Sequence, residues 1–191
     1  KGQGKASATD ADADTTALTE VAFCADSALA TIKAQCDFGP RVPNSEAHRR
    51  CADYIVARFK ALGLDVCEQK TDLRAWDGNT LASRNIIASY RPDLADRILI
   101  CTHWESRPWA DADPDSTLHR QPVMAANDGA SGIAVMLEVA RLVSTDTTMQ
   151  RGIDFVCFDT EDWGTPQWAD QTDDADTWAL GAQYYATHLP A

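Results

Sequence analysis

The sequence predicts an α/β fold in which a central mixed, mostly parallel β-sheet is flanked by helices. The first observation is the near-continuous apolar run over residues 152–158, which is typical of a strand buried on both faces. The second is that helical patterns alternate with this and other strand-like segments. The third is size, since 191 residues with 45% hydrophobic content can bury one core and favour a single domain.

The start of the chain differs in composition from the rest. Residues 1–16 contain only Gly, Ala, Ser, Thr, Asp, Lys and Gln, which offer too little apolar surface to offset the entropy of ordering. We therefore expect a flexible tether over residues 1–17 and the α/β domain over residues 18–191. Such a leader is typical of an exported, periplasmic or lipid-anchored bacterial protein, although an intracellular chain with a disordered tail has the same composition.

Two helices are predicted in the first third of the chain. A mixed apolar and polar pattern over residues 18–35 indicates the first helix, and the Gly- and Pro-containing segment 38–43 breaks it. Asn44 or Ser45 can cap the second helix, and Gly63 supplies its stop. The buried face of this second helix follows three-four spacing through Cys51, Tyr54, Ile55, Arg58, Phe59 and Leu62.

The remaining elements alternate between strands and helices. β-Branched and apolar runs bounded by turn residues predict strands at residues 65–73, 83–90 and 97–102, before the apolar strand 152–158. Apolar helical patterns cover residues 133–143 and 178–188. The polar connection 104–124 is too long for an ordinary link in a compact domain, so we expect it to border a functional site.

Charge and apolar run length exclude two classes of partner. The formal net charge is −12, whereas binding to phosphate backbones needs clustered Lys and Arg, so nucleic acid is not an expected partner. A membrane span is not expected either, because no run of about 18 apolar residues is present.

The six cysteines do not settle the compartment. On one continuous helix, Cys24 and Cys36 would lie about 18 Å apart, beyond the reach of a disulfide. Cys101 and Cys157 sit near the ends of apolar strands, where small buried free thiols are common, so we expect both to pack inertly.

Polar residues follow the predicted strands at the edge where α/β sheets collect ligands. His103 and the pair Glu161 and Asp162 come at strand ends, and Asp128 precedes a helix. Each has a simpler interpretation when it is taken alone. His103 could be a structural histidine, Asp128 could be the N-cap of its helix, and the pair Glu161 and Asp162 could lie in a solvated acidic loop. Their conjunction favours a divalent metal site, since a buried lone carboxylate is costly and usually meets a metal or takes part in acid/base chemistry.

The chemistry of these side chains suits zinc. A catalytic zinc takes three protein ligands and leaves one position open, and Asp128 and Asp162 can supply two, with His103 as a further candidate. Glu161, next to a ligand, can act as general acid/base. Adjacent side chains of an extended strand face opposite sides, so the backbone must bend at residues 161–162 for both acids to serve one site.

Tryptophans crowd the same loops. Trp104 and Trp168 are candidate substrate-binding residues, since aromatic side chains around a few polar groups are typical of a ligand pocket. Ordinary packing is the simpler interpretation for any one of them. Five of the six tryptophans lie in or beside these loops: Trp104, Trp109, Trp163, Trp168 and Trp178.

Four motifs in this order resemble the zinc aminopeptidase superfamily, and within it the glutaminyl-peptide cyclotransferases of the animal type that also occur in bacteria. The resemblance covers residues 36–188 and is more specific for the superfamily than for the branch. The motifs are Phe-Gly-Pro-Arg at 38–41, Thr-His-Trp-Glu-Ser at 102–106, Ala-Asn-Asp-Gly-Ala-Ser-Gly at 126–132 and Phe-Asp-Thr-Glu-Asp at 158–162.

The resemblance implies one zinc and conversion of the N-terminal glutamine of a peptide to pyroglutamate with release of ammonia. It assigns zinc to Asp128 and Asp162 and proton transfer to Glu161, and it matches Trp168 to a pocket aromatic. Asp162 stands where many relatives have Glu. His103 matches a ligand of the second metal in dinuclear aminopeptidases and a non-ligating neighbour in cyclases.

The resemblance also implies that this chain is about the N-terminal two-thirds of one zinc-peptidase-like domain. The family takes its third zinc ligand, a histidine, from a segment downstream, and no residue here matches it. Apolar surface left uncovered would favour self-association. Two other functions stay open: a zinc aminopeptidase that hydrolyses N-terminal residues, and a non-catalytic module that binds peptides through its Trp-rich loops.

Overall fold

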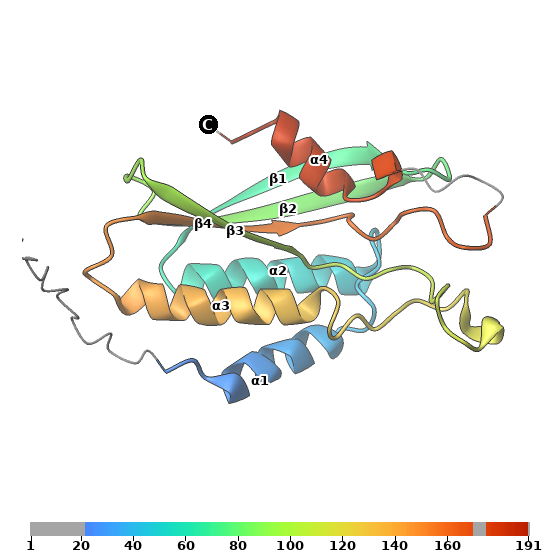
Figure 1. The fold of residues 1–191 in the computed structure, drawn as a ribbon, viewed down its shortest axis with the longest axis horizontal. Coiled ribbons are helices and arrows are strands. Elements are labelled where there is room, and N and C mark those ends of the chain that lie inside the picture. The colour runs from blue at the N-terminus through green and yellow to red at the C-terminus, as the bar shows by residue number, and fades with distance from the viewer. Residues whose placement is uncertain (1–21, 170–174, 191) are drawn as a thin grey trace, which may run out of the picture.

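The computed structural model describes residues 22–169 and 175–190, and the predicted tether at residues 1–17 lies outside them. These residues form a four-stranded sheet in the order β1-β2-β4-β3 with helices on both faces, as predicted (Figure 1). The strands are β1 (Asp65–Arg74), β2 (Thr80–Tyr90), β3 (Arg97–His103) and β4 (Gly152–Phe158).

The sheet is mixed, as expected, but less parallel than expected. β3 pairs parallel with β4, whereas β1 with β2 and β2 with β4 pair antiparallel. β1 and β2 are joined by a short turn containing Gly78 at φ +85°, and strands joined so closely can pair only in antiparallel fashion.

Among the described residues, helices α2 (Glu46–Ala61) and α3 (Ala130–Thr145) cover one face of the sheet, and α4 (Leu180–Thr187) covers the other (Figure 1). On the first face α2 and α3 lie along the strands, and α1 packs against α3. α4 lies on the opposite face over β1 and β2. The helices are α1 (Ala25–Cys36), α2 (Glu46–Ala61), α3 (Ala130–Thr145) and α4 (Leu180–Thr187), with short 3₁₀ helices at Ser116–Leu118 and Ala175–Thr177.

Helix α2 forms as its sequence predicts. The Ser45 side chain caps it by accepting a hydrogen bond from the backbone N–H of His48 at 3.1 Å. Gly63, at φ +80°, follows the end of the helix in the left-handed conformation that glycine adopts readily. Cys51 and Phe59 on its buried face are fully enclosed. The phenylalanine ring lies 5.7 Å from that of Phe155 on β4, so α2 is fixed directly to the central strand.

The core lies between the sheet and the helices α2 and α3. Phe155 and Cys157 of β4 are fully buried and pack with residues of α3 such as Ile133 and Leu137. The strand predicted to be buried is therefore the strand that organises the core. None of the helices in the described part of the chain is long and apolar enough to cross a membrane.

The cysteines are all free thiols. Cys24 immediately precedes α1 and Cys36 ends it, so the helix holds them apart as predicted. Cys157 is buried as expected, but Cys101 is exposed, and the packing role expected for it is wrong. The reason is the position of β3, which is an edge strand of the described sheet and also leaves Leu99 54% exposed.

Candidate functional site

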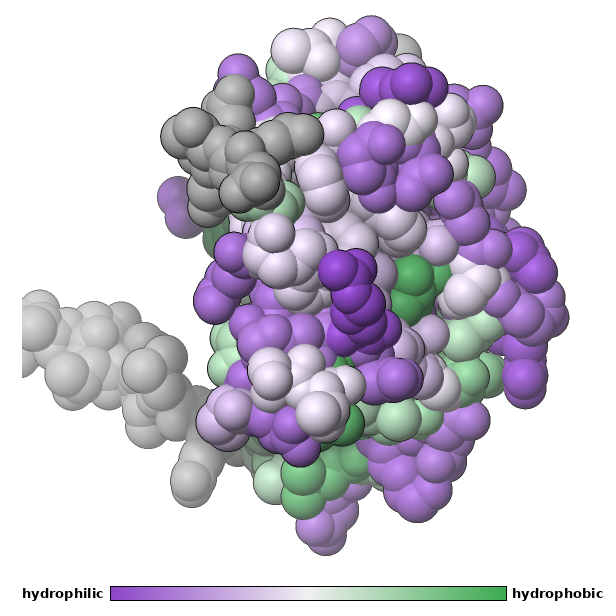
Figure 2. All heavy atoms as spheres, turned by 90° about the vertical axis from the view of Figure 1, so that its right-hand side faces the viewer, coloured by the Kyte–Doolittle hydropathy of each residue, from purple (hydrophilic) through white to green (hydrophobic). Residues whose placement is uncertain are grey.

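The C-terminal ends of β3 and β4 and the start of α3 meet at one end of the sheet, as the sequence predicts. The parallel register places His103, the last residue of β3, opposite Phe158, the last residue of β4. The backbone N–H of Trp104 donates to the carbonyl of Phe158 at 3.1 Å and keeps the two strand exits together. This end of the molecule has a mostly hydrophilic surface with smaller hydrophobic areas (Figure 2).

The backbone bends directly after β4, as the use of both acids in one site requires. Thr160 has a φ of +53°, in the left-handed region. The fully buried Asp159 stabilises the bend by accepting hydrogen bonds from the backbone N–H of Thr160 at 2.8 Å and of Arg84 at 2.7 Å. His48 of α2 contacts the same carboxylate at 2.9 Å, so helix and strand both support the turn.

Glu105 is the residue at the centre of the site, and the sequence analysis gave it no role. It is fully buried, and its Oε1 accepts the backbone N–H groups of Glu161 and Asp162, each at 2.8 Å. Burial raises the pKa of Glu105, but His103 and the backbone donors outweigh this and hold the pKa below its usual range. Glu105 is therefore a charged carboxylate that holds the backbone of Glu161 and Asp162 in place.

His103 has carboxylates near both ring nitrogens. Its Nε2 lies 2.7 Å from Asp128 Oδ1, and its Nδ1 lies 3.4 Å from Glu105 Oε2 and 3.7 Å from Glu161 Oε2. Burial lowers the pKa of His103, but Glu105, Asp128 and Glu161 together raise it to about 10. At neutral pH the ring is therefore a cation among three acids.

Asp128 reaches His103 because of the glycine that follows it. Gly129 has a φ of +107°, and a Cβ at this position would lie 2.8 Å from the backbone oxygen of Glu105. Only glycine allows the loop to approach the β3 exit so closely. The Asp128 side chain is 75% exposed, so apart from its contact with His103 it faces solvent.

The donor atoms in this cluster fit a metal ion. One ligand atom from each of His103, Glu105 and Glu161 lies within 4.8 Å of the others. His103 Nδ1 and Glu105 Oε2 are buried and face one another as an ion pair at 3.4 Å without a hydrogen bond, so a metal that bound here would replace the proton on Nδ1. Imidazole with carboxylates is a donor set that zinc accepts.

The structure does not bring Asp128 and Asp162 into one donor group. Asp162 Oδ1 lies 3.1 Å from Arg107 Nη1, and its side chain is 13% exposed. Burial raises the pKa of Asp162 to about 7, with Glu105 and Glu161 adding to the rise and Arg107 opposing it. The assignment of both aspartates to zinc and of Glu161 to catalysis stays a prediction.

The substrate-binding role expected for Trp104 is wrong. Trp104 is fully buried in the core and stacks on His48, with ring centroids 4.4 Å apart. The physical reason is alternation along an extended strand: if His103 faces the site, its neighbour must face the other side. Trp168 is only partly buried and remains a candidate for contact with a substrate.

Trp168 belongs to a tryptophan cluster that we call the Trp cluster, formed by Trp76, Trp109, Trp163 and Trp168. Trp109 lies at its centre, edge-on to the other three rings at centroid distances of 6.1 Å, 5.6 Å and 5.8 Å, respectively. Trp76, in the β1–β2 turn, was missed by the sequence analysis because it lies far from the acids along the chain. The cluster joins three loops into an aromatic wall.

Arg41, in the Phe-Gly-Pro-Arg motif, holds the long connection 104–124 in place through hydrogen bonds. It is fully buried and donates to the backbone carbonyls of Trp104 at 3.2 Å, Met124 at 2.9 Å and Ala125 at 2.7 Å. The two ends of the connection 104–124 are thereby held against one another. The sequence marked this motif but gave no hint of its carbonyl partners.

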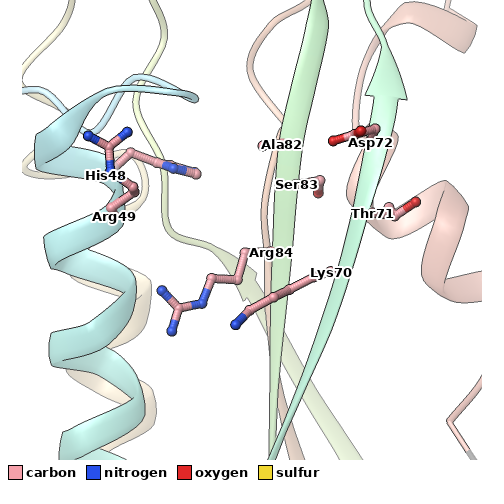
Figure 3. A pocket seen from close by; sticks show the side chains of 8 residues that line it. All are labelled: His48, Arg49, Lys70, Thr71, Asp72, Ala82, Ser83 and Arg84. Carbon is pink, nitrogen blue, oxygen red and sulfur yellow. The ribbon is translucent and has the colours of Figure 1, made fainter.

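A separate pocket of about 470 Å³ lies between α2 and the β1–β2 hairpin (Figure 3). His48 and Arg49 line it from α2, with Lys70 and Arg84 opposite. Arg84 is paired with Asp53 and Glu68, and Arg49 with Glu46, so these cations already have acidic partners. The site at the C-terminal ends of β3 and β4 has a cluster of possible metal ligands, whereas the described residues that line this pocket form no such cluster.

Comparison with known proteins agrees with this geometry. Residues 85–191 match peptidase family M28. A glutaminyl cyclase of Bacteroides thetaiotaomicron, solved bound to N-acetylhistamine, is 46% identical with a TM-score of 0.84, over 86% of this chain and 56% of that one. A Zn-dependent exopeptidase of Parabacteroides distasonis is 43% identical with a TM-score of 0.85, over 88% of this chain and 57% of that one.

A curated relative matches this chain at lower identity. The alkaline phosphatase isozyme conversion protein of Escherichia coli (strain K12) is 28% identical over 142 residues, which are 66% of this chain and 39% of that protein. This chain thus spans less than two-thirds of the length of each relative. Bacterial glutaminyl cyclases and zinc exopeptidases are its close structural neighbours, and the chain belongs to peptidase family M28.

Proposed function

We propose that this protein is a zinc-dependent glutaminyl-peptide cyclotransferase that converts the N-terminal glutamine of peptides to pyroglutamate and releases ammonia. Its family supports the use of zinc, and neighbours such as the Bacteroides thetaiotaomicron and Tannerella forsythia glutaminyl cyclases support the reaction. Asp128 and Asp162 are the proposed zinc ligands within this chain, and Glu161 is the proposed general acid/base.

The observation that carries this proposal is the environment of Glu161. Its side chain is 36% exposed, so a substrate can reach it, while Glu105 beside it is buried. Burial raises the pKa of Glu161, and Glu105 and Asp128 add to the rise against the lowering effect of His103. A carboxylate whose pKa is moved toward neutrality is suited to take up and return a proton.

Cyclisation needs one proton transfer that this residue can perform. The α-amine nitrogen of the substrate forms a bond to the side-chain carbonyl carbon of glutamine, and the bond from that carbon to the amide nitrogen breaks. Glu161 takes a proton from the attacking amine and gives it to the leaving nitrogen, which departs as ammonia. Zinc, when bound, supplies a Lewis acid for the carbonyl oxygen.

The contact of His103 with Asp128 favours the cyclase over a dinuclear peptidase. The Nε2 atom of His103 lies 2.7 Å from Oδ1 of Asp128, so His103 contacts a proposed ligand, as the non-ligating histidine of a cyclase would. A zinc aminopeptidase remains the second candidate, because His103, Glu105 and Glu161 form a donor group of their own and the Parabacteroides distasonis neighbour is an exopeptidase.

An assay with two substrates separates these functions. We expect the full-length protein with zinc to release ammonia from a peptide that begins with glutamine, to leave its peptide bonds intact, and to bind one zinc. A leucine amide serves as the parallel substrate. Free amino acid from either substrate, with two zinc ions bound, would assign the aminopeptidase instead. Binding of the peptide without any turnover would assign a peptide-binding module.

A further inference from the structure

We propose that Arg107 is a positioning residue that orients the Asp162 carboxylate for zinc and connects the metal site to the Trp-rich loops. The inference rests on the proposed function in one respect, which is that Asp162 is a zinc ligand. Arg107 lies in the long connection after β3 and has a side chain that is 12% exposed. It is therefore a mostly buried cation in the wall of the site.

Arg107 holds Asp162 at two points. Its Nη1 donates to the backbone carbonyl of Asp162 at 3.0 Å and to Oδ1 of the side chain at 3.1 Å. The first contact fixes the backbone of the ligand and the second fixes the rotation of its carboxylate. Among the described residues, no hydrogen bond to Oδ2 occurs. A metal-binding carboxylate whose other oxygen is hydrogen-bonded is the usual arrangement around metal sites.

The remainder of the guanidinium is bound to Asp111. Nε and Nη2 each donate to one oxygen of that carboxylate at 2.7 Å, a fork-shaped contact that is short and directional. Burial raises the pKa of Asp111, but Arg107 and the backbone N–H of Gln167 outweigh this and hold it below its usual value. Asp111 therefore offsets part of the charge of Arg107.

Aromatic contacts extend the connection to the Trp-rich loops. The guanidinium carbon lies 5.5 Å from the ring centroid of Trp109, the centre of the Trp cluster, and 4.6 Å from that of Trp178. Asp111 also accepts the backbone N–H of Gln167 at 3.0 Å, next to Trp168 in the chain. One side chain thus joins a proposed zinc ligand to the Trp cluster.

Zinc affinity of the full-length protein, measured by competition with a chelator, tests this inference. We expect R107M to weaken zinc binding by about 10- to 100-fold, as the loss of a hydrogen bond to a metal ligand typically does. R107K keeps the positive charge but cannot form the paired hydrogen bonds to Asp111, so we expect a smaller loss of zinc affinity. The control is R151M, which removes an exposed arginine whose Nε lies 2.9 Å from Asp96, and which should leave zinc affinity unchanged.

The increase in melting temperature on adding zinc distinguishes positioning of Asp162 by Arg107 from a general contribution of Arg107 to stability. A purely structural role for Arg107 would lower the melting temperature equally with and without zinc, whereas positioning predicts that R107M shrinks the rise. Should R107M fail to fold, R107K and D111N provide the comparison, and both should bind zinc more weakly. Unchanged or tighter zinc binding in these variants overturns the inference and leaves the proposed function standing. Absence of stoichiometric zinc in the unchanged protein overturns both.

Discussion

Replacing Glu161 by glutamine is expected to reduce the rate of ammonia release from a glutamine peptide by about a hundredfold or more. Glutamine keeps the size of the side chain but cannot carry a proton between the attacking amine and the leaving nitrogen. The Glu161 side chain is partly exposed, lies 3.7 Å from His103 and is not the part of the residue that is bonded to Glu105, since that bond comes from the backbone N–H, so we expect the fold to be retained. The measurement is the single-turnover rate at saturating zinc.

The matched control for this variant is Glu46→Gln. Glu46 is an exposed acid at the start of α2, paired with Arg49, and its replacement should leave the rate unchanged. Zinc content should be equal in both variants and the unchanged protein. If Glu161→Gln retained a rate within threefold of the unchanged protein, Glu161 could not be the group that transfers the proton.

Replacing Glu105 by glutamine is expected to lower the free energy of unfolding by about 1–3 kcal/mol, because it weakens buried hydrogen bonds and removes one of the three acids around the His103 cation. The pair that is lost is Glu105 with His103, and the glutamine also becomes a weaker acceptor for the backbone of Glu161 and Asp162. Chemical denaturation of the zinc-free protein measures the loss. Glu138→Gln, which alters the pair with Arg141 on α3, controls for loss of an Arg-bound carboxylate away from the site.

The pH dependence of stability gives a second reading of the same pair. The pKa of His103 is raised from 6.5 to about 10 in the folded protein. A raised pKa means that the protonated form is stabilised by folding, so this contribution is complete below pH 6.5 and is lost as pH rises toward 10. We expect Glu105→Gln to flatten this decline in the zinc-free protein. An unaltered pH profile would show that Glu105 does not hold the charge of His103.

The elements that a strong local pattern specifies were predictable. The near-continuous apolar run of β4 and the three-four spacing of α2 reflect burial that the sequence itself records, and both elements appear as expected. The approach of His103 to Asp128 and Glu161 also followed from sequence, because neighbouring parallel strands end at the same end of the sheet, whereas Asp162 instead contacts Arg107. The exposure of Cys101 did not follow, since whether a strand lies at an edge depends on the whole sheet.

The roles of Glu105 and Arg107 depend on tertiary contacts between loops, which leave little periodic signal. The two acidic partners of Arg107 lie four residues away, at Asp111, and 55 residues away, at Asp162, and nothing in the local sequence connects the two. A signal for Glu105 was present, however. Alternation places it on the same side of the extended chain as His103 and places Trp104 on the other, which would have predicted both the buried acid and the core tryptophan.

The position of zinc in crystals of the full-length protein tests the central claim most directly. Anomalous scattering at the zinc edge should give one peak, at about 2.0–2.2 Å from a carboxylate oxygen of Asp128 and from one of Asp162. Binding would then draw the exposed Asp128 and the Arg107-bound Asp162 onto a single ion. A peak held by His103, Glu105 and Glu161, with both aspartates unengaged, would contradict the account, as would a zinc-soaked crystal with no peak at this edge of the sheet.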